Sequence, residues 1–151
     1  MEVYSTGFTQ KTAEQFFESL RRVGIRRLVD VRLNNSSQLA AFSKRDDLGY
    51  FLRELCHAEY RHEPLLAPTQ ELLDAYKKRH GSWAEYERGF LALMRDRHIE
   101  EVFAPSQFDT PTVLLCSELT AEHCHRRLVL EYLQDQWGNS HNLHDLQIVH
   151  L

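Results

Sequence analysis

The chain has 151 residues, the size of a single domain that can bury a core without disulfides. Hydrophobic residues make up 42% and charged residues 26% of it, which excludes a disordered chain, a collagen-like chain and a disulfide scaffold. With 18 basic and 22 acidic side chains the formal charge is −4, so a nucleic-acid role would need a local basic patch.

Signals for export or membrane insertion are not found. No run approaches the roughly 18 consecutive apolar residues that a transmembrane helix needs, and the N-terminus lacks the basic-then-apolar pattern of a signal peptide. The three cysteines are therefore expected to be reduced thiols. We expect a cytoplasmic protein with no membrane partner.

Strand-like and helix-like patterns alternate along the chain. Two helix starts carry a capping box, in which a hydroxyl and a Gln or Glu side chain satisfy each other's backbone N–H groups; these are Thr12–Gln15 and Ser82–Glu85. Glycines at 24 and 138 stand where helices usually end. The predicted elements are, in chain order, strand Glu2–Gly7, helix Thr12–Val23, strand Arg27–Arg32, a turn-rich loop Asn34–Ser37, a helix from about Asp46 to His57, strand Ala58–His62, a helix from Pro68 through Tyr76, a helix from Ser82 through Met94, strand Thr112–Cys116, helix Thr120–Gln136 and strand Leu146–Leu151.

This order, β-α-β-α-β-α-α-β-α-β, predicts a mostly parallel sheet of about five strands with helices on its faces. No internal repeat, low-complexity tract or linker interrupts it. We therefore expect residues 1–151 to form a single α/β domain.

Polar side chains gather where the predicted strands end, and open parallel sheets bind ligands beyond the carboxyl ends of their strands. The candidates for ligand binding are Arg32, Asn34, His62, Glu118, Cys124, His125 and Arg126. We expect one shared cleft lined by Asp30, Arg32, Cys116, Glu118, Cys124, His125 and Arg126.

Cys116 and Asp30 are the two candidates for catalysis. Cys116 ends an apolar strand just before a predicted helix start, where unpaired N–H groups lower the pKa of a thiol; a buried, inert cysteine is the alternative. Asp30 and Arg32 are two residues apart in a strand, so they point to the same face and serve either a ligand or a buried salt bridge. Cys124 lies about one turn into the predicted helix and could approach Cys116; the two would then form either a redox couple or, as the favoured alternative, part of the core.

Four potential metal ligands are close together in the sequence: Cys116, His123, Cys124 and His125. Structural zinc sites usually present paired ligands two to four residues apart in two clusters. Here the spacing is Cys-x7-Cys-His, and no second cluster of that kind follows. We therefore expect no metal and no cofactor.

The charges of the candidate cleft indicate the class of ligand. Arg32 and Arg126 could hold an anionic group while Asp30 and Glu118 accept hydrogen bonds from its other end. Mixed charge of this kind suits a small anionic or nucleotide-like molecule better than bare phosphate. One alternative is a non-catalytic scaffold domain. The other is a nucleic-acid-associated module for DNA processing or defence, which would bind phosphates through Arg21, Arg22, Arg26 and Arg27. The negative net charge of the chain disfavours this alternative.

Seven short motifs follow one another along the chain: Ser5-Thr-Gly7, Val29-Asp-Val-Arg32, Phe42-Ser-Lys44, Tyr60-x-His62-x-Pro-Leu65, Leu115-Cys-Ser-Glu118, Cys124-His-Arg126 and Val149-His-Leu151. Together they resemble DUF488, a family defined by a domain of unknown function. The resemblance implies a Rossmann-like, three-layer domain and does not supply a reaction. The chain departs from the family's usual Thr-Ile-Gly-His-Ser opening, because Tyr4-Ser-Thr-Gly-Phe-Thr9 lacks that histidine.

Overall fold

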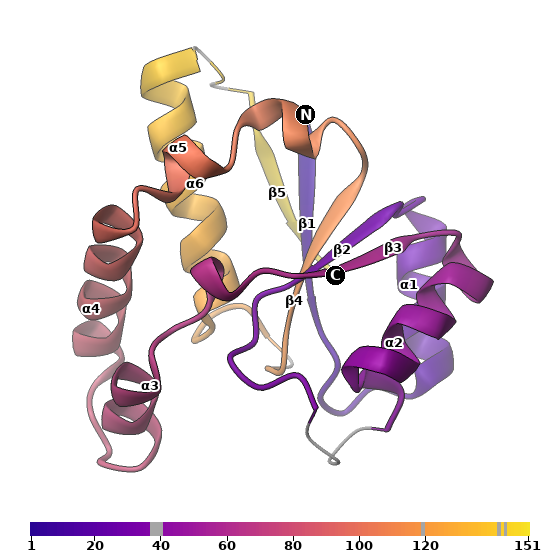
Figure 1. The fold of residues 1–151 in the computed structure, drawn as a ribbon, viewed down its shortest axis with the longest axis horizontal. Coiled ribbons are helices and arrows are strands. Elements are labelled where there is room, and N and C mark those ends of the chain that lie inside the picture. Colours follow the sequence, from indigo (N-terminus) through magenta and orange to yellow (C-terminus); the bar gives the residue numbers. More distant parts are fainter. Residues whose placement is uncertain (37–40, 119, 142, 144) are drawn as a thin grey trace.

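The computed structural model describes residues 1–36, 41–118, 120–141, 143 and 145–151. In this part of the chain, five strands form one sheet in the order β3-β2-β4-β1-β5 (Figure 1). Every neighbouring pair is parallel, as the alternation of elements predicts. The strands are β1 (Glu2–Gly7), β2 (Arg27–Asp30), β3 (Glu59–His62), β4 (Thr112–Cys116) and β5 (Gln147–His150).

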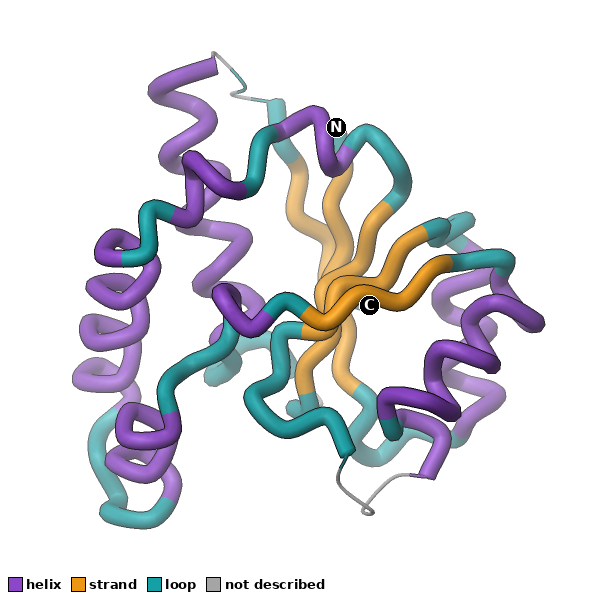
Figure 2. The backbone as a smooth tube through the Cα atoms, in the orientation of Figure 1, coloured by secondary structure: helices purple, strands orange, loops and turns teal. Residues whose placement is uncertain are grey.

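Helices cover both faces of the sheet, which makes the domain three-layered (Figure 2). One face carries the first two helices, and the other carries the remaining four. None of the helices within the described residues combines the length and the apolar character needed to cross a bilayer. The helices are α1 (Ala13–Arg22), α2 (Arg45–Phe51) with a π-helical continuation (Leu52–Cys56), α3 (Gln70–Lys77), α4 (Trp83–Asp96), α5 (Ile99–Val102) and α6 (His125–His141).

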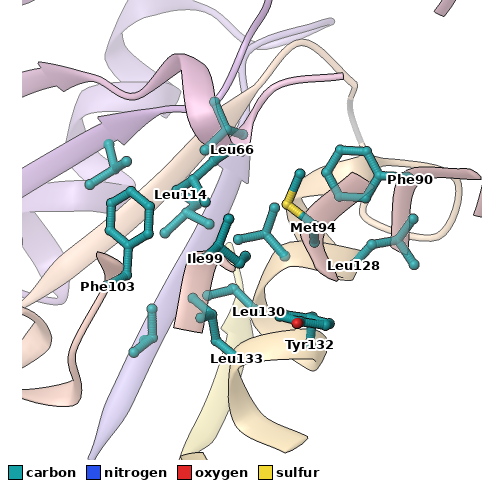
Figure 3. Close-up of a cluster of buried hydrophobic side chains, with 14 of the residues drawn as sticks. Leu66, Phe90, Met94, Ile99, Phe103, Leu114, Leu128, Leu130, Tyr132 and Leu133 are labelled. Carbon is teal, nitrogen blue, oxygen red and sulfur yellow. The ribbon is translucent and has the colours of Figure 1, made fainter. Parts of the chain in front are cut away.

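The core consists of two apolar clusters, one on each face of the sheet. Because successive side chains of a strand point to opposite faces, Leu114 and Cys116 of β4 belong to the cluster with α4 and α6, part of which Figure 3 shows. Val113 and Leu115 belong to the cluster with α1 and α2. The sulfur of Cys116 is therefore on the α4–α6 side of the sheet.

The carboxyl end of β4 is the place where the connections separate. β4 lies between β2 and β1. The chain leaves β1 toward α1 on one face of the sheet, and it leaves the neighbouring β4 toward α6 on the other face (Figure 1). Diverging connections of this kind open a crevice above the sheet.

Most predicted elements are present, and β1 and β4 have the predicted bounds. The Thr12 capping box forms in full. At Ser82 the structure gives one half of the predicted box, in which the Ser82 hydroxyl accepts from the Glu85 N–H. Gly24 follows α1 with φ +70°, the left-handed conformation that favours glycine. The loop over 34–37 is confirmed through residue 36, and Ser37 lies outside the described residues.

The predicted boundaries of β2 and α6 differ most from the structure. β2 ends at Asp30 rather than Arg32. α6 begins at His125 rather than Thr120, and it continues through Gly138 to His141. Tertiary packing stabilises the last turns of α6, since Trp137 is fully buried there and its indole N–H donates to the Phe103 carbonyl at 3.1 Å.

Candidate functional site

A pocket of about 210 Å³ opens at the carboxyl end of β4. Side chains of α3 and α4 supply an aromatic wall of Tyr76, Trp83 and Tyr86. The Trp83 ring stacks on Tyr86, with ring centroids 5.3 Å apart, and on His123, with centroids 5.0 Å apart. The polar part of the lining consists of Arg32, Asn34, Lys77, Cys116, Ser117, Glu118, His123, Cys124 and His125.

The pocket brings together most of the residues predicted to form the site. Arg32, Asn34, Cys116, Glu118, Cys124 and His125 line it, whereas Asp30, His62 and Arg126 do not. Sequence reasoning missed Lys77 and the aromatic wall. Tyr76, Trp83 and Tyr86 stand at positions typical of helix faces that pack in a core, and no local pattern indicates that α3 and α4 meet the end of β4.

Cys116 is buried at the pocket, with 6% of the residue exposed. Its pKa is lowered, first because the Cys124 thiol donates a hydrogen bond to its sulfur. Burial opposes this effect, while the backbone N–H groups of Ser117 and Glu118 and the charge of Arg126 reinforce it. The sequence predicts that the N–H groups of a helix N-terminus lower this pKa. Because α6 begins only at His125, the loop amides of Ser117 and Glu118 have this effect instead.

His125 holds the start of α6 against the end of β2. Burial lowers the pKa of its ring, so the ring is neutral and its Nε2–H donates to the Val31 carbonyl at 2.7 Å. The Cys116 sulfur lies 3.7 Å from Nδ1 and 3.9 Å from Nε2. A sulfur on the lone-pair axis of one ring nitrogen would be much farther from the other, so neither lone pair points at Cys116.

The orientation of His125 bears on metal binding. The sulfurs of Cys116 and Cys124 and a ring nitrogen of His125 all lie within 4.8 Å of one another. Zinc needs the lone pair of an imidazole nitrogen directed at the ion, and the ring would have to turn to provide it. As it stands, the ring anchors the backbone and serves neither as a base for Cys116 nor as a metal ligand shared with it.

Asp30 and Arg32 form a buried salt bridge, the structural alternative considered for this pair. The Nε and Nη2 atoms of Arg32 each lie 2.8 Å from a carboxylate oxygen of Asp30, and Nη2 also donates to the Ser43 carbonyl at 2.6 Å. The Tyr60 hydroxyl donates to the same carboxylate at 2.6 Å. Asp30 has no exposed surface, so it orients Arg32 at the edge of the pocket without lining the pocket itself. His62 braces the same segment, with Nε2 2.9 Å from the Arg32 carbonyl.

Arg126 supports the loop that follows Cys116. Only 1% of it is exposed, and it lies in the first turn of α6 rather than in the predicted second turn. Its Nη1 donates to the Glu118 carbonyl at 2.8 Å and its Nε to the Ser5 hydroxyl at 3.2 Å. The Glu118 side chain turns the other way and pairs with Lys77 at 2.9 Å, both being about half exposed.

We expect Arg126→Lys to lower the free energy of unfolding by about 1–3 kcal/mol. A lysine ammonium cannot reach the Glu118 carbonyl and the Ser5 hydroxyl at once, as the guanidinium does, so one of these acceptors loses its partner. Urea denaturation followed by circular dichroism measures the loss. Arg21→Lys is the matched control. Arg21 pairs with Glu18 at 2.6 Å, and both side chains are about half exposed, so the change should cost less than about 0.5 kcal/mol. Equal midpoints for the two variants would show that Arg126 does not hold the loop.

The arginines of the nucleic-acid alternative mostly bond within the chain. Arg21 pairs with Glu18 at 2.6 Å, Arg26 donates to the Cys56 carbonyl at 3.0 Å, and Arg27 contacts Glu59 and the Gln107 carbonyl. These contacts reduce the positive charge that this surface offers to a phosphate backbone.

A family model described as "Domain of unknown function DUF488" matches residues 12–133. The matched span includes every residue that lines the pocket, and it bears out the resemblance carried by the sequence motifs. No curated protein and no solved structure matches the chain.

Proposed function

This chain belongs to the DUF488 family, and we propose that its pocket binds a small anionic or nucleotide-like molecule and acts on it through Cys116. One observation carries the proposal: a cysteine whose pKa is lowered lies in a pocket that has an aromatic wall. Thiolates are the reactive form of cysteine. A structural cysteine buried in apolar surroundings has the opposite tendency, as Cys56 illustrates, since burial raises its pKa.

The lining supports the ligand class. An aromatic lining such as that of Tyr76, Trp83 and Tyr86 favours a planar ring. The volume of about 210 Å³ is below the roughly 300–1,000 Å³ of drug-sized sites, so it suits a ring of nucleobase size whose charged group stays at the mouth. Lys77 stands there, paired with the exposed carboxylate of Glu118. An incoming anion would exchange with that carboxylate.

The charge balance favours a small molecule over a polyanion. Arg32 is neutralised by Asp30, and Lys77 by Glu118. The basic patch that the nucleic-acid alternative requires is likewise largely paired within the chain. A polyanion is bound through many unpaired cations, whereas a single mixed-charge ligand needs only one or two.

Alkylation with a charged and an uncharged reagent tests the proposal. Iodoacetate and iodoacetamide have nearly the same size, and only the first is an anion. We expect Cys116 to react about tenfold faster than Cys56 at pH 7, because the thiolate is the nucleophile. We also expect a higher iodoacetate-to-iodoacetamide rate ratio at Cys116 than at Cys56. Mass mapping of tryptic peptides separates the sites, and a panel of nucleoside 5′-monophosphates should slow the reaction at Cys116 alone.

Lys77→Met should remove the preference of Cys116 for iodoacetate. Lys78→Met is the matched control, because Lys78 is mostly exposed and pairs with Asp74 outside the pocket. Faster labelling of Cys56, or the same reagent ratio at both cysteines, would make Cys116 a packed core residue and would leave the scaffold alternative in place.

A further inference from the structure

The second thiol of the pocket, Cys124, serves the proposed function only by helping to lower the pKa of Cys116. It is 2% exposed, it lines the same pocket, and its sulfur lies within 4.8 Å of the Cys116 sulfur. The two sulfurs share a hydrogen bond in which the Cys124 thiol is the donor, and this bond raises the pKa of Cys124. A neutral thiol is therefore held against a sulfur that favours the thiolate.

The local chain allows the two sulfurs to come closer. Cys116 is the last residue of β4 and is fixed by the sheet. Cys124 is held in a turn before α6, where its N–H donates to the Ala121 carbonyl at 3.2 Å. A disulfide needs a sulfur–sulfur separation of about 2.05 Å, and movement of this turn can supply the approach without unfolding either element.

Cys56 provides an internal contrast. Its sulfur contacts the Phe17 carbonyl at 3.9 Å and belongs to the apolar cluster on the opposite face of the sheet. All three cysteines are unpaired and buried in this structure. The sheet separates Cys56 from the other two, so only Cys116 and Cys124 are placed to react with each other.

We propose that Cys116 and Cys124 form a reversible, peroxide-sensitive disulfide at the inner end of the pocket. The Cys116 thiolate attacks one oxygen of a hydroperoxide, the O–O bond breaks, and the departing oxygen takes up a proton, leaving a sulfenic acid on Cys116. The Cys124 sulfur then attacks the sulfenic sulfur. An S–S bond forms, and the hydroxyl leaves as water with the proton of the Cys124 thiol. The two thiols supply two electrons in total, and a small dithiol reductant returns them by exchange.

Oxidation would remove the Cys116 thiolate, the nucleophile of the proposed function. The disulfide itself does not depend on that function, since it is detected without any ligand. Failure of the disulfide would leave the alkylation result for Cys116 intact. Failure of the reagent preference would leave disulfide formation intact.

Hydrogen peroxide applied to the reduced protein tests the pair directly. Residues 98–126 form one tryptic peptide that contains both cysteines, whereas Cys56 falls on the peptide 54–61. We expect the first peptide to lose two hydrogens and to resist alkylation, while Cys56 is still alkylated. Dithiothreitol should restore two alkylatable thiols. The control Cys56→Ser should leave this pattern unchanged.

The Cys124→Ser variant should stop at the sulfenic acid on Cys116, which dimedone traps. If that variant does not fold, phenylarsine oxide, which bridges two neighbouring thiols, should block both cysteines of the wild-type peptide and leave Cys56 free. Dimedone-labelled or sulfinic Cys116 beside an alkylated Cys124 in oxidised wild-type protein would overturn the proposal. Oxidation of Cys56 at the same rate as the pair would overturn it too.

Discussion

Gly7→Ala is expected to abolish folding or to lower the free energy of unfolding by more than about 4 kcal/mol, the range of exceptional single substitutions. A Cβ on Gly7 would lie 1.6 Å from the Glu118 carbonyl oxygen and 2.6 Å from the carbonyl carbon. These are backbone atoms, so the whole turn after Cys116 would have to move. That turn is tied down by Arg126 and by the Thr9 N–H, which donates to the Ser117 carbonyl at 3.2 Å.

Gly49→Ala is the matched control for this prediction. A Cβ on Gly49 would meet its nearest neighbour, the Cβ of Tyr60, at an ordinary 3.8 Å. Gly49 lies inside α2, where alanine should stabilise the protein by about 0.4–1 kcal/mol. Urea denaturation of the two variants measures the contrast. A Gly7→Ala protein with the wild-type midpoint would mean that the turn after Cys116 is not packed on β1.

Removing one member of the Asp30–Arg32 pair is expected to cost about 3–5 kcal/mol, because the other charge is left buried without its partner. Asp30→Asn and Arg32→Met are the single changes. The double variant should be more stable than the sum of the two losses predicts, by about 1–3 kcal/mol, since it leaves no unpaired charge. Urea denaturation of all four proteins closes the cycle.

The exposed pair Arg21–Glu18 is the control for this cycle. Both side chains are about half exposed, so Arg21→Met should cost less than about 0.5 kcal/mol.

The Asp30–Arg32 cycle also separates a structural from a ligand-binding role for Arg32. Near-wild-type stability of Arg32→Met together with loss of the iodoacetate preference at Cys116 would assign Arg32 to the ligand.

Features that depend on neighbouring residues follow from the amino-acid sequence. The start of α1 follows from the reciprocal hydrogen bonds of Thr12 and Gln15, three residues apart. The burial of β4 follows from its apolar run. Asp30 and Arg32 meet as the sequence predicts, but not through the strand period, because β2 ends at Asp30 and the Arg32 guanidinium reaches the carboxylate from beyond the strand. The parallel sheet follows from the alternation of elements, because a strand–helix–strand connection returns the chain in the same direction.

The arrangement of the site depends on contacts between segments that are far apart in the sequence. The aromatic wall comes from α3 and α4, and no periodicity relates Trp83 to Cys116. The late start of α6 is another case: Arg126 donates to the Glu118 carbonyl, and the Cys124 N–H donates to the Ala121 carbonyl in a turn before the helix. Long-range contacts of this kind exist only once the chain has folded, and their packing and hydrogen bonds outweigh the local helical preference of residues 120–124.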